Sequence, residues 1–136
     1  MSQSAYGSIA VQGLYNQETS FSSNITTTSA TAVVMTGMTI TPPAGTYLVI
    51  FSSWFTHSNG NATVTIGIYV AGVQNAGSVR TTIPFTGAVG GANNGQEAGT
   101  NAIVSVNGSQ AIALEWLTST GTATAHAGTF DIVKIG

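Results

Sequence analysis

The stretch TPPAGTYLVIFSSWFTHSNGNATVTIGIYVAGVQ, residues 41–74, decides the fold class of this 136-residue chain. A turn rich in proline and glycine comes first, and a strand is expected over Tyr47–Phe55. Successive side chains of a strand point to opposite faces. Positions 47–51 (YLVIF) are all apolar, so this strand has two apolar faces and needs a second partner surface besides its own core. We expect that partner to be another subunit.

A polar turn, HSNGN at 57–61, leads to a second strand in which apolar and more polar residues alternate. Period-two alternation is typical of a strand with one buried face. Ala71-Gly72 then predicts a two-residue hairpin loop. The stretch therefore indicates an antiparallel β-sandwich, with these apolar positions in its core: Val64, Ile66, Ile68 and Val70.

The rest of the chain repeats this pattern of short strands between glycine- and asparagine-rich breakers. The segment 17–31 is polar, with Phe21 and Ile25 as isolated apolar anchors, and no strand is assigned to it. The segment 87–99 is expected to be irregular, and Asn107-Gly108 is a strong hairpin signal. We predict an all-β, single-domain antiparallel β-sandwich (a jelly roll) over residues 1–136. It would have roughly nine or ten short strands, with residues 1–14 as an attachment arm. Besides the two strands above, we expect strands at Tyr6–Val11, Ala32–Ile40, Val79–Phe85, Asn101–Val106, Gln110–Leu117, Ala123–Ala127 and Thr129–Ile135.

The composition suits a protein built into an assembly. Only 4% of the residues are charged, against about 25% in an average domain. Such a surface has little electrostatic protection against association. Disorder is excluded because 43% of the residues are hydrophobic and follow strand periods, whereas disordered segments combine low hydrophobicity with high charge.

Charge and cysteine content exclude further classes of partner. The net charge is −2 and no Lys/Arg cluster is present, so we expect no nucleic acid partner. No apolar run reaches the roughly 18 to 20 residues of a membrane span, and we expect no membrane partner. No secretory signal is expected from the N-terminal residues. The chain has no cysteine, which fits a protein made in a reducing cytoplasm.

Four blocks carry a family resemblance: PAGTYLVIF at 43–51, IGIYVAGV at 66–73, VSVNG at 104–108 and IALEW at 112–116. Their order resembles the complement globular-head and tumour necrosis factor-like jelly rolls, over about residues 6–135. The resemblance implies a compact homotrimer that buries apolar faces around a three-fold axis. The chain departs from the animal members because it has no collagen stalk and no acidic cluster suited to Ca²⁺. A stalkless, cysteine-free version of this kind is most similar to small jelly-roll domains of tailed-phage virions.

Histidine offers few candidates for chemistry. His57 and His126 are the only imidazoles. They are open to interpretation as a metal pair, as a general base, or as three copies of one residue around an axial ion in a trimer. The structural alternative makes His57 a turn residue and His126 a strand-face residue. We favour this alternative, because metal ligands usually cluster at characteristic spacings.

The remaining candidates for catalysis are also isolated. Glu115 lies on the opposite strand face from Trp116 and is expected to be an exposed or interface carboxylate that pairs with Arg80 or Lys134. The chain has no Gly-x-Ser-x-Gly elbow and no phosphate-binding loop. We therefore expect a non-enzymatic protein with no cofactor and no metal.

The candidate interaction residues form two groups. Aromatic and aliphatic side chains of the central strands are assigned to the core or the trimer interface, with a sugar-binding platform as the alternative for the exposed aromatics. These are Tyr47, Val49, Phe51, Trp54 and Trp116. Chain ends and long loops supply the partner contacts, because the sandwich does not use them. These are Tyr6, Ile9, Val11, Asn93, Asn94 and Glu97.

Two functions are favoured by this pattern over a third, a secreted or spore-surface ligand of the complement-head type. The first is a virion structural protein assembled in the host cytoplasm, a trimeric decoration (cement) protein on a phage capsid. The second is the receptor- or glycan-binding tip of a phage head or tail fibre, with a host-surface glycan as partner. Both use one fold, and a fold does not decide function.

Overall fold

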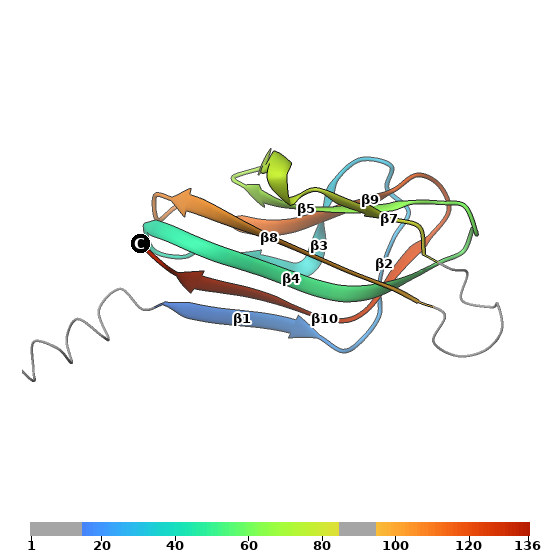
Figure 1. Cartoon of the computed structure of the whole chain (residues 1–136), viewed down its shortest axis with the longest axis horizontal. Coiled ribbons are helices and arrows are strands. Elements are labelled where there is room, and N and C mark those ends of the chain that lie inside the picture. Colours follow the sequence, from blue (N-terminus) through green and yellow to red (C-terminus); the bar gives the residue numbers. More distant parts are fainter. Residues whose placement is uncertain (1–14, 85–94) are drawn as a thin grey trace, which may run out of the picture.

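The computed structural model describes residues 15–84 and 95–136, and this part of the chain is almost entirely β structure (Figure 1). A single 3-10 turn, η1 (Ala76–Ser78), interrupts the strands of the described part. The strands are β1 (Asn16–Phe21), β2 (Ile25–Thr27), β3 (Val33–Ile40), β4 (Gly45–His57), β5 (Val64–Val70), β6 (Val73–Gln74), β7 (Arg80–Thr82), β8 (Gln96–Val106), β9 (Ile112–Thr118) and β10 (Ala123–Lys134).

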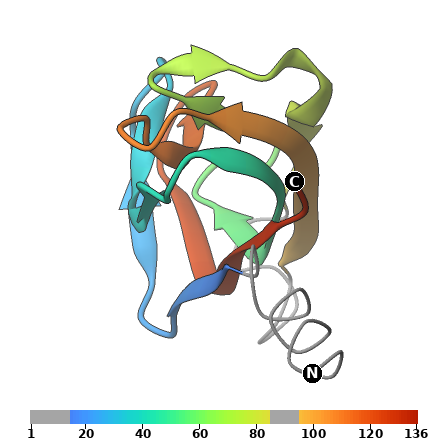
Figure 2. The same cartoon turned by 90° about the vertical axis from the view of Figure 1, so that its left-hand side faces the viewer.

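The strands form two antiparallel sheets. The β4 sheet has the order β1-β10-β4-β8, and β2 also pairs with β10. The β9 sheet has the order β3-β9-β5-β6, and β7 also pairs with β5. The end-on view in Figure 2 shows the two sheets enclosing the interior. The predicted all-β antiparallel sandwich is confirmed.

Large side chains of both sheets fill the space between them. Trp116 on β9 lies with its ring centroid 6.1 Å from that of Phe55 on β4. On β5, Val64, Ile66 and Ile68 are buried as the alternation predicts, and Val70 packs against the core from its edge. Burial of this apolar surface is the main stabilising contribution to such a fold.

Several predicted boundaries were wrong. No strand was predicted in the polar segment 17–31, yet β1 and β2 occupy much of that stretch and pair with β10. Their polar side chains lie on a solvated sheet face, which hides the strand signal. The irregular segment expected at 87–99 ends earlier, since β8 begins at Gln96. The strand predicted at Val79–Phe85 is reduced to β7, and the predicted strand Tyr6–Val11 lies outside the described residues.

One bulge joins two predicted strands into one. The strands expected at Ala123–Ala127 and Thr129–Ile135 are the single strand β10, whose register against β4 shifts between His126 and Gly128. Ala127, the extra residue, has a φ of 25°. A β-bulge leaves one residue unpaired and reverses the alternation beyond it. β3 has an irregularity of its own, a register shift against β9 between Val34 and Thr39.

Candidate functional site

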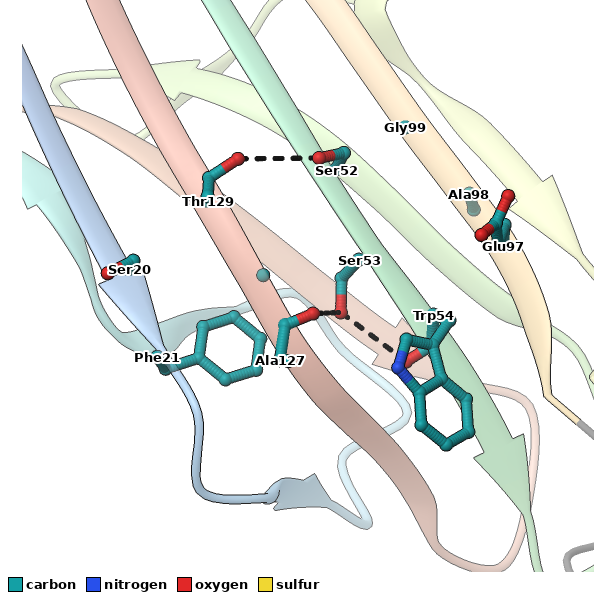
Figure 3. A pocket seen from close by; sticks show the side chains of 11 residues that line it. Ser20, Phe21, Ser52, Ser53, Trp54, Glu97, Ala98, Gly99, Ala127 and Thr129 are labelled. Carbon is teal, nitrogen blue, oxygen red and sulfur yellow. Dashed lines mark hydrogen bonds between the residues drawn. The ribbon is translucent and has the colours of Figure 1, made fainter. Parts of the chain in front are cut away.

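The candidate site lies on the outer face of the β4 sheet, which points away from the core. A shallow depression of about 680 Å³ crosses this face from β1 to β8 (Figure 3). Its volume lies within the range usual for ligand sites, about 300–1,000 Å³. The lining residues are Ser20, Phe21, Ser52, Ser53, Trp54, Glu97, Ala98, Gly99, Ala127, Gly128 and Thr129.

Small residues hollow the sheet at this point. A Cβ on Gly99 would lie 2.8 Å from the carbonyl oxygen of Phe51, and a Cβ on Gly128 would lie 2.7 Å from that of Ser52. Both distances are too short, so any larger residue at either position would push the strands apart. The bulge at Ala127 also falls here. The floor of the depression is therefore fixed by the backbone.

The depression has hydroxyl groups across its centre. The hydroxyls of Ser52 and Thr129 lie 3.3 Å apart on neighbouring strands, as Figure 3 shows. Ser53 donates to the carbonyl oxygen of His126 at 2.9 Å and so ties β4 to the bulge. Ser20 on β1 adds an exposed hydroxyl in the same row as Thr129.

Trp54 and Glu97 form one side of the depression. They are paired directly across β4 and β8. The indole ring of Trp54 stacks on the imidazole of His126, with centroids 3.9 Å apart and planes 11° apart. The other contacts of the indole include Gly95, where a Cβ would lie 2.0 Å from Cε3. These contacts hold Trp54 in one orientation beside the carboxylate of Glu97.

The two histidines have separate structural roles. His126 lies on a strand face as predicted, and that face is the outer one. Its Nε2 is 2.8 Å from the hydroxyl of Thr56, and burial lowers its pKa. His57 was predicted to be a turn residue. It is the last residue of β4 and only 2% exposed. The two side chains therefore face opposite sides of the β4 sheet and cannot share a metal ion within one chain.

Buried hydrogen bonds hold His57. Its Nδ1 accepts from the backbone N–H of Asn59 at 2.8 Å, and its Nε2 lies 2.7 Å from the hydroxyl of Thr118. With Nδ1 as acceptor, the ring is neutral and Nε2 carries the proton. Burial lowers the pKa of His57 accordingly.

The other predicted site residues fall in three places. Four of the predicted residues have side chains buried in the core: Tyr47, Val49, Phe51 and Trp116. Glu97 belongs to a strand, β8, and not to a loop as predicted. Five predicted contact residues lie outside the described residues: Tyr6, Ile9, Val11, Asn93 and Asn94.

Glu115 differs in part from its prediction. It lies on the outer face of the β9 sheet, where it is half-buried, and burial raises its pKa. The guanidinium of Arg80 donates instead to the backbone carbonyls of Gly77 and Val79, at 3.0 and 2.7 Å. Among residues 15–84 and 95–136, no three His, Cys, Asp or Glu side chains group in a way that could hold a metal ion. No helix in that part of the chain is long and apolar enough to cross a membrane.

An apolar patch lies on the same outer face, beside the depression. Leu48 on β4 is paired with Ile103 on β8 and with Val133 on β10. Ile50 lies two residues further along β4 and is 42% exposed. These four residues, called here the outer apolar patch, confirm that β4 has apolar side chains on both faces. Ile103 and Val133 were not predicted, although alternation along their own strands would have placed both opposite the core.

The fold and this outer face define a jelly-roll-type β-sandwich with one partly apolar, partly hollowed sheet face. The chain is similar to VP2 of infectious bursal disease virus in a subviral particle, with a TM-score of 0.62 and 10% identity over 92% of this chain and 34% of VP2. It is also similar to the Eiger TNF of S. frugiperda, with a TM-score of 0.55 and 9% identity over 92% of this chain and 94% of that one. A third similar structure is dimeric latent PorU from Porphyromonas gingivalis, with a TM-score of 0.50 and 11% identity over 90% of this chain and 13% of PorU.

These similarities show the fold alone. The chain spans about a third of the length of the VP2 proteins that it matches. No protein-family model matches the sequence, and neither does any curated protein. The predicted resemblance to tumour necrosis factor-like jelly rolls is confirmed at the level of the fold.

Proposed function

We propose that this protein is a non-enzymatic structural component of a virus particle and acts as a homotrimer. Its finer form is a decoration (cement) protein on a phage capsid, made of one domain over residues 1–136. The observation that carries the proposal is the outer apolar patch in a chain with 4% charged residues. An exposed apolar patch of this kind marks a protein contact. The fold it shares with a capsid protein and a TNF supports the same assignment.

A second apolar surface favours a ring over a two-fold dimer. A groove of about 430 Å³ lies where β6 and β8 form one edge of the sandwich. Its walls include Val73, which is 70% exposed, and Ile103, which is 62% exposed. A face on one subunit against a different edge on the next is a head-to-tail contact, which closes into a ring when the rotation between subunits is a whole fraction of a turn. Three-fold closure is the arrangement that the tumour necrosis factor-like resemblance implies.

The test is the mass of the protein in solution, measured by sedimentation or native mass spectrometry. We expect a trimer, and we expect Ile103→Lys to dissociate it, because Ile103 is paired with Leu48 and an ammonium group cannot be buried unpaired in an apolar contact. Val34→Lys is the matched control. Val34 is also an exposed β-branched residue, 46% exposed, but lies on the β9 sheet. A monodisperse monomer or a dimer of the unmodified protein would refute the proposal.

The second candidate function is a receptor- or glycan-binding tip of a phage fibre. The observation that favours it is the depression, which places Trp54, Glu97 and several hydroxyl groups together on an exposed face. Loss of host adsorption from particles that lack this protein but stay intact would favour the second candidate. Loss of particle integrity would favour the first.

A further inference from the structure

We propose that the depression on the outer face of the β4 sheet binds a neutral sugar residue. The site lies within a single subunit. The inference rests on the second candidate function above, and it specifies where the glycan binds and which class of sugar the site accepts. The argument rests on the chemistry of the lining, on its charge and on its rigidity.

The lining offers complementary groups for a polyhydroxylated ring. Ser20, Ser52 and Thr129 bring hydroxyls from three neighbouring strands to one surface. A hydroxyl both donates and accepts a hydrogen bond, as sugar hydroxyls do. Phe21 and Trp54 stand at opposite sides of the depression (Figure 3) and supply aromatic surface for the C–H groups of the ring.

Charge selects the class of sugar. Glu97 is the only charged residue of the lining, and it is exposed. An ionised carboxylate has two acceptor oxygens and can accept from two adjacent sugar hydroxyls. Such charge-assisted hydrogen bonds are stronger than neutral ones. The same negative charge repels an acidic sugar such as a uronic acid, so the site favours neutral sugars.

The site is already formed without a ligand. The stacking of Trp54 on His126 and the close approach of Gly95 fix the indole. The glycines at 99 and 128 fix the floor. A preformed site loses little conformational entropy on binding. Because the depression is shallow and open, a single sugar should still bind weakly, with a Kd on the order of 1 mM.

The outer apolar patch and the depression lie along the same face, so two occupants of the depression must be compared. Part of a second copy of the chain would need apolar contact or charge complementarity. The centre of the depression offers Ser52, Thr129 and glycine backbone, while the exposed aliphatic residues gather at Leu48 and Ile103. The observations therefore favour a sugar in the depression and a subunit on the apolar patch.

The two tryptophans make the experiment direct. Trp54 borders the depression, whereas Trp116 is buried in the core. The ¹H–¹⁵N NMR signals of their indole N–H groups can be followed while methyl glycosides of glucose, galactose and mannose are added. We expect a saturable shift of the Trp54 signal with at least one of these sugars and none of the Trp116 signal. The methyl glycoside of glucuronic acid should bind at least tenfold more weakly than that of glucose.

Variants of the lining complete the test. Glu97→Gln and Ser52→Trp should each weaken binding tenfold or more, the first by removing the carboxylate and the second by filling the depression. Glu18→Gln is the control, since Glu18 is an exposed carboxylate of the same sheet outside the lining. Trp54→Ala should abolish binding, and its thermal unfolding shows whether it still folds. If the Trp54→Ala variant does not fold, the surface variants Glu97→Gln and Ser52→Trp still test the proposal.

Three results would overturn the proposal. The first is no shift of the Trp54 signal with any neutral glycoside. The second is equal binding of the glucuronide. The third is a Ser52→Trp variant that dissociates the trimer without changing sugar binding, which would make the depression a subunit contact. Sugar binding by the Ile103→Lys variant separates this proposal from the trimer, because each chain carries a whole site.

Discussion

At the scale of single residues, His57 couples the fold to pH. Its ring is buried, neutral and hydrogen-bonded through both nitrogens. Protonation would place a second proton on Nδ1 and break the hydrogen bond from the N–H of Asn59. Burial lowers the pKa of His57 below the value of about 6.5 that the unfolded chain has.

The sign of the pH dependence follows from that shift. The unfolded chain takes up the proton first, so the free energy of unfolding falls as pH drops below about 6.5, and the loss stops below the folded-state pKa. At higher pH, where His57 is neutral in both the folded and the unfolded chain, it does not change the free energy of unfolding with pH. We expect His57→Gln to lower the stability at pH 8 and to flatten the decline between pH 8 and 5.5.

Urea unfolding at several pH values measures this prediction. His57→Gln is compared with His57 in a His126→Gln background, because burial also lowers the pKa of His126 and that ring would add a slope of the same sign. Burial raises the pKa of Glu115, which acts in the opposite direction at lower pH, so the comparison stays above pH 5.5. A slope that His57→Gln leaves unchanged would contradict the assignment.

At the scale of the strand, β5 shows how register separates buried from exposed positions. Ile66 is buried against the other sheet, whereas Thr65 points outward and lies 2.9 Å from the hydroxyl of Thr81 on β7. A shift of one residue would exchange these faces. The observed register places β5 beside β9 along its whole length.

Paired substitutions test this register. Ile66→Ala should lower the free energy of unfolding by about 2–5 kcal/mol, because it removes buried surface and leaves a cavity. Thr65→Ala removes one exposed hydrogen bond and should cost well under that. Chemical denaturation of both variants gives the comparison, and equal losses would show that the register is wrong.

At the scale of the whole molecule, low charge determines how the protein should attach to a particle. Six charged side chains leave little for salt to screen. If the contact is made by apolar and hydrogen-bonding groups, its affinity should vary little with ionic strength.

Rebinding to stripped particles measures the attachment. We expect nearly constant binding over a range of salt concentrations, and loss of binding when residues 1–14 are removed or the 87–95 segment is shortened. These segments hold five of the proposed partner contacts: Tyr6, Ile9, Val11, Asn93 and Asn94. Steep salt dependence would contradict a neutral contact. Full rebinding of both shortened chains would rule out these segments.

The sequence by itself determined the fold class and the core of this protein. Hydrophobic periodicity is a local property, so β4 and β5 could be predicted from residues 41–74, and glycine and asparagine marked the turns between strands. The same reasoning failed at β1, where a polar segment becomes a strand only because β10 offers it hydrogen bonds.

Only the tertiary structure decided the candidate site. The depression takes residues from β1, β4, β8 and β10, which are far apart in the sequence. Strand pairing and the bulge at Ala127 bring Trp54 beside His126 and Glu97. Nothing in the local sequence specifies which strands become neighbours, because that choice depends on how the two sheets bury their apolar faces together. For the same reason, the sequence alone could not place His57 in the core and His126 on the outer face.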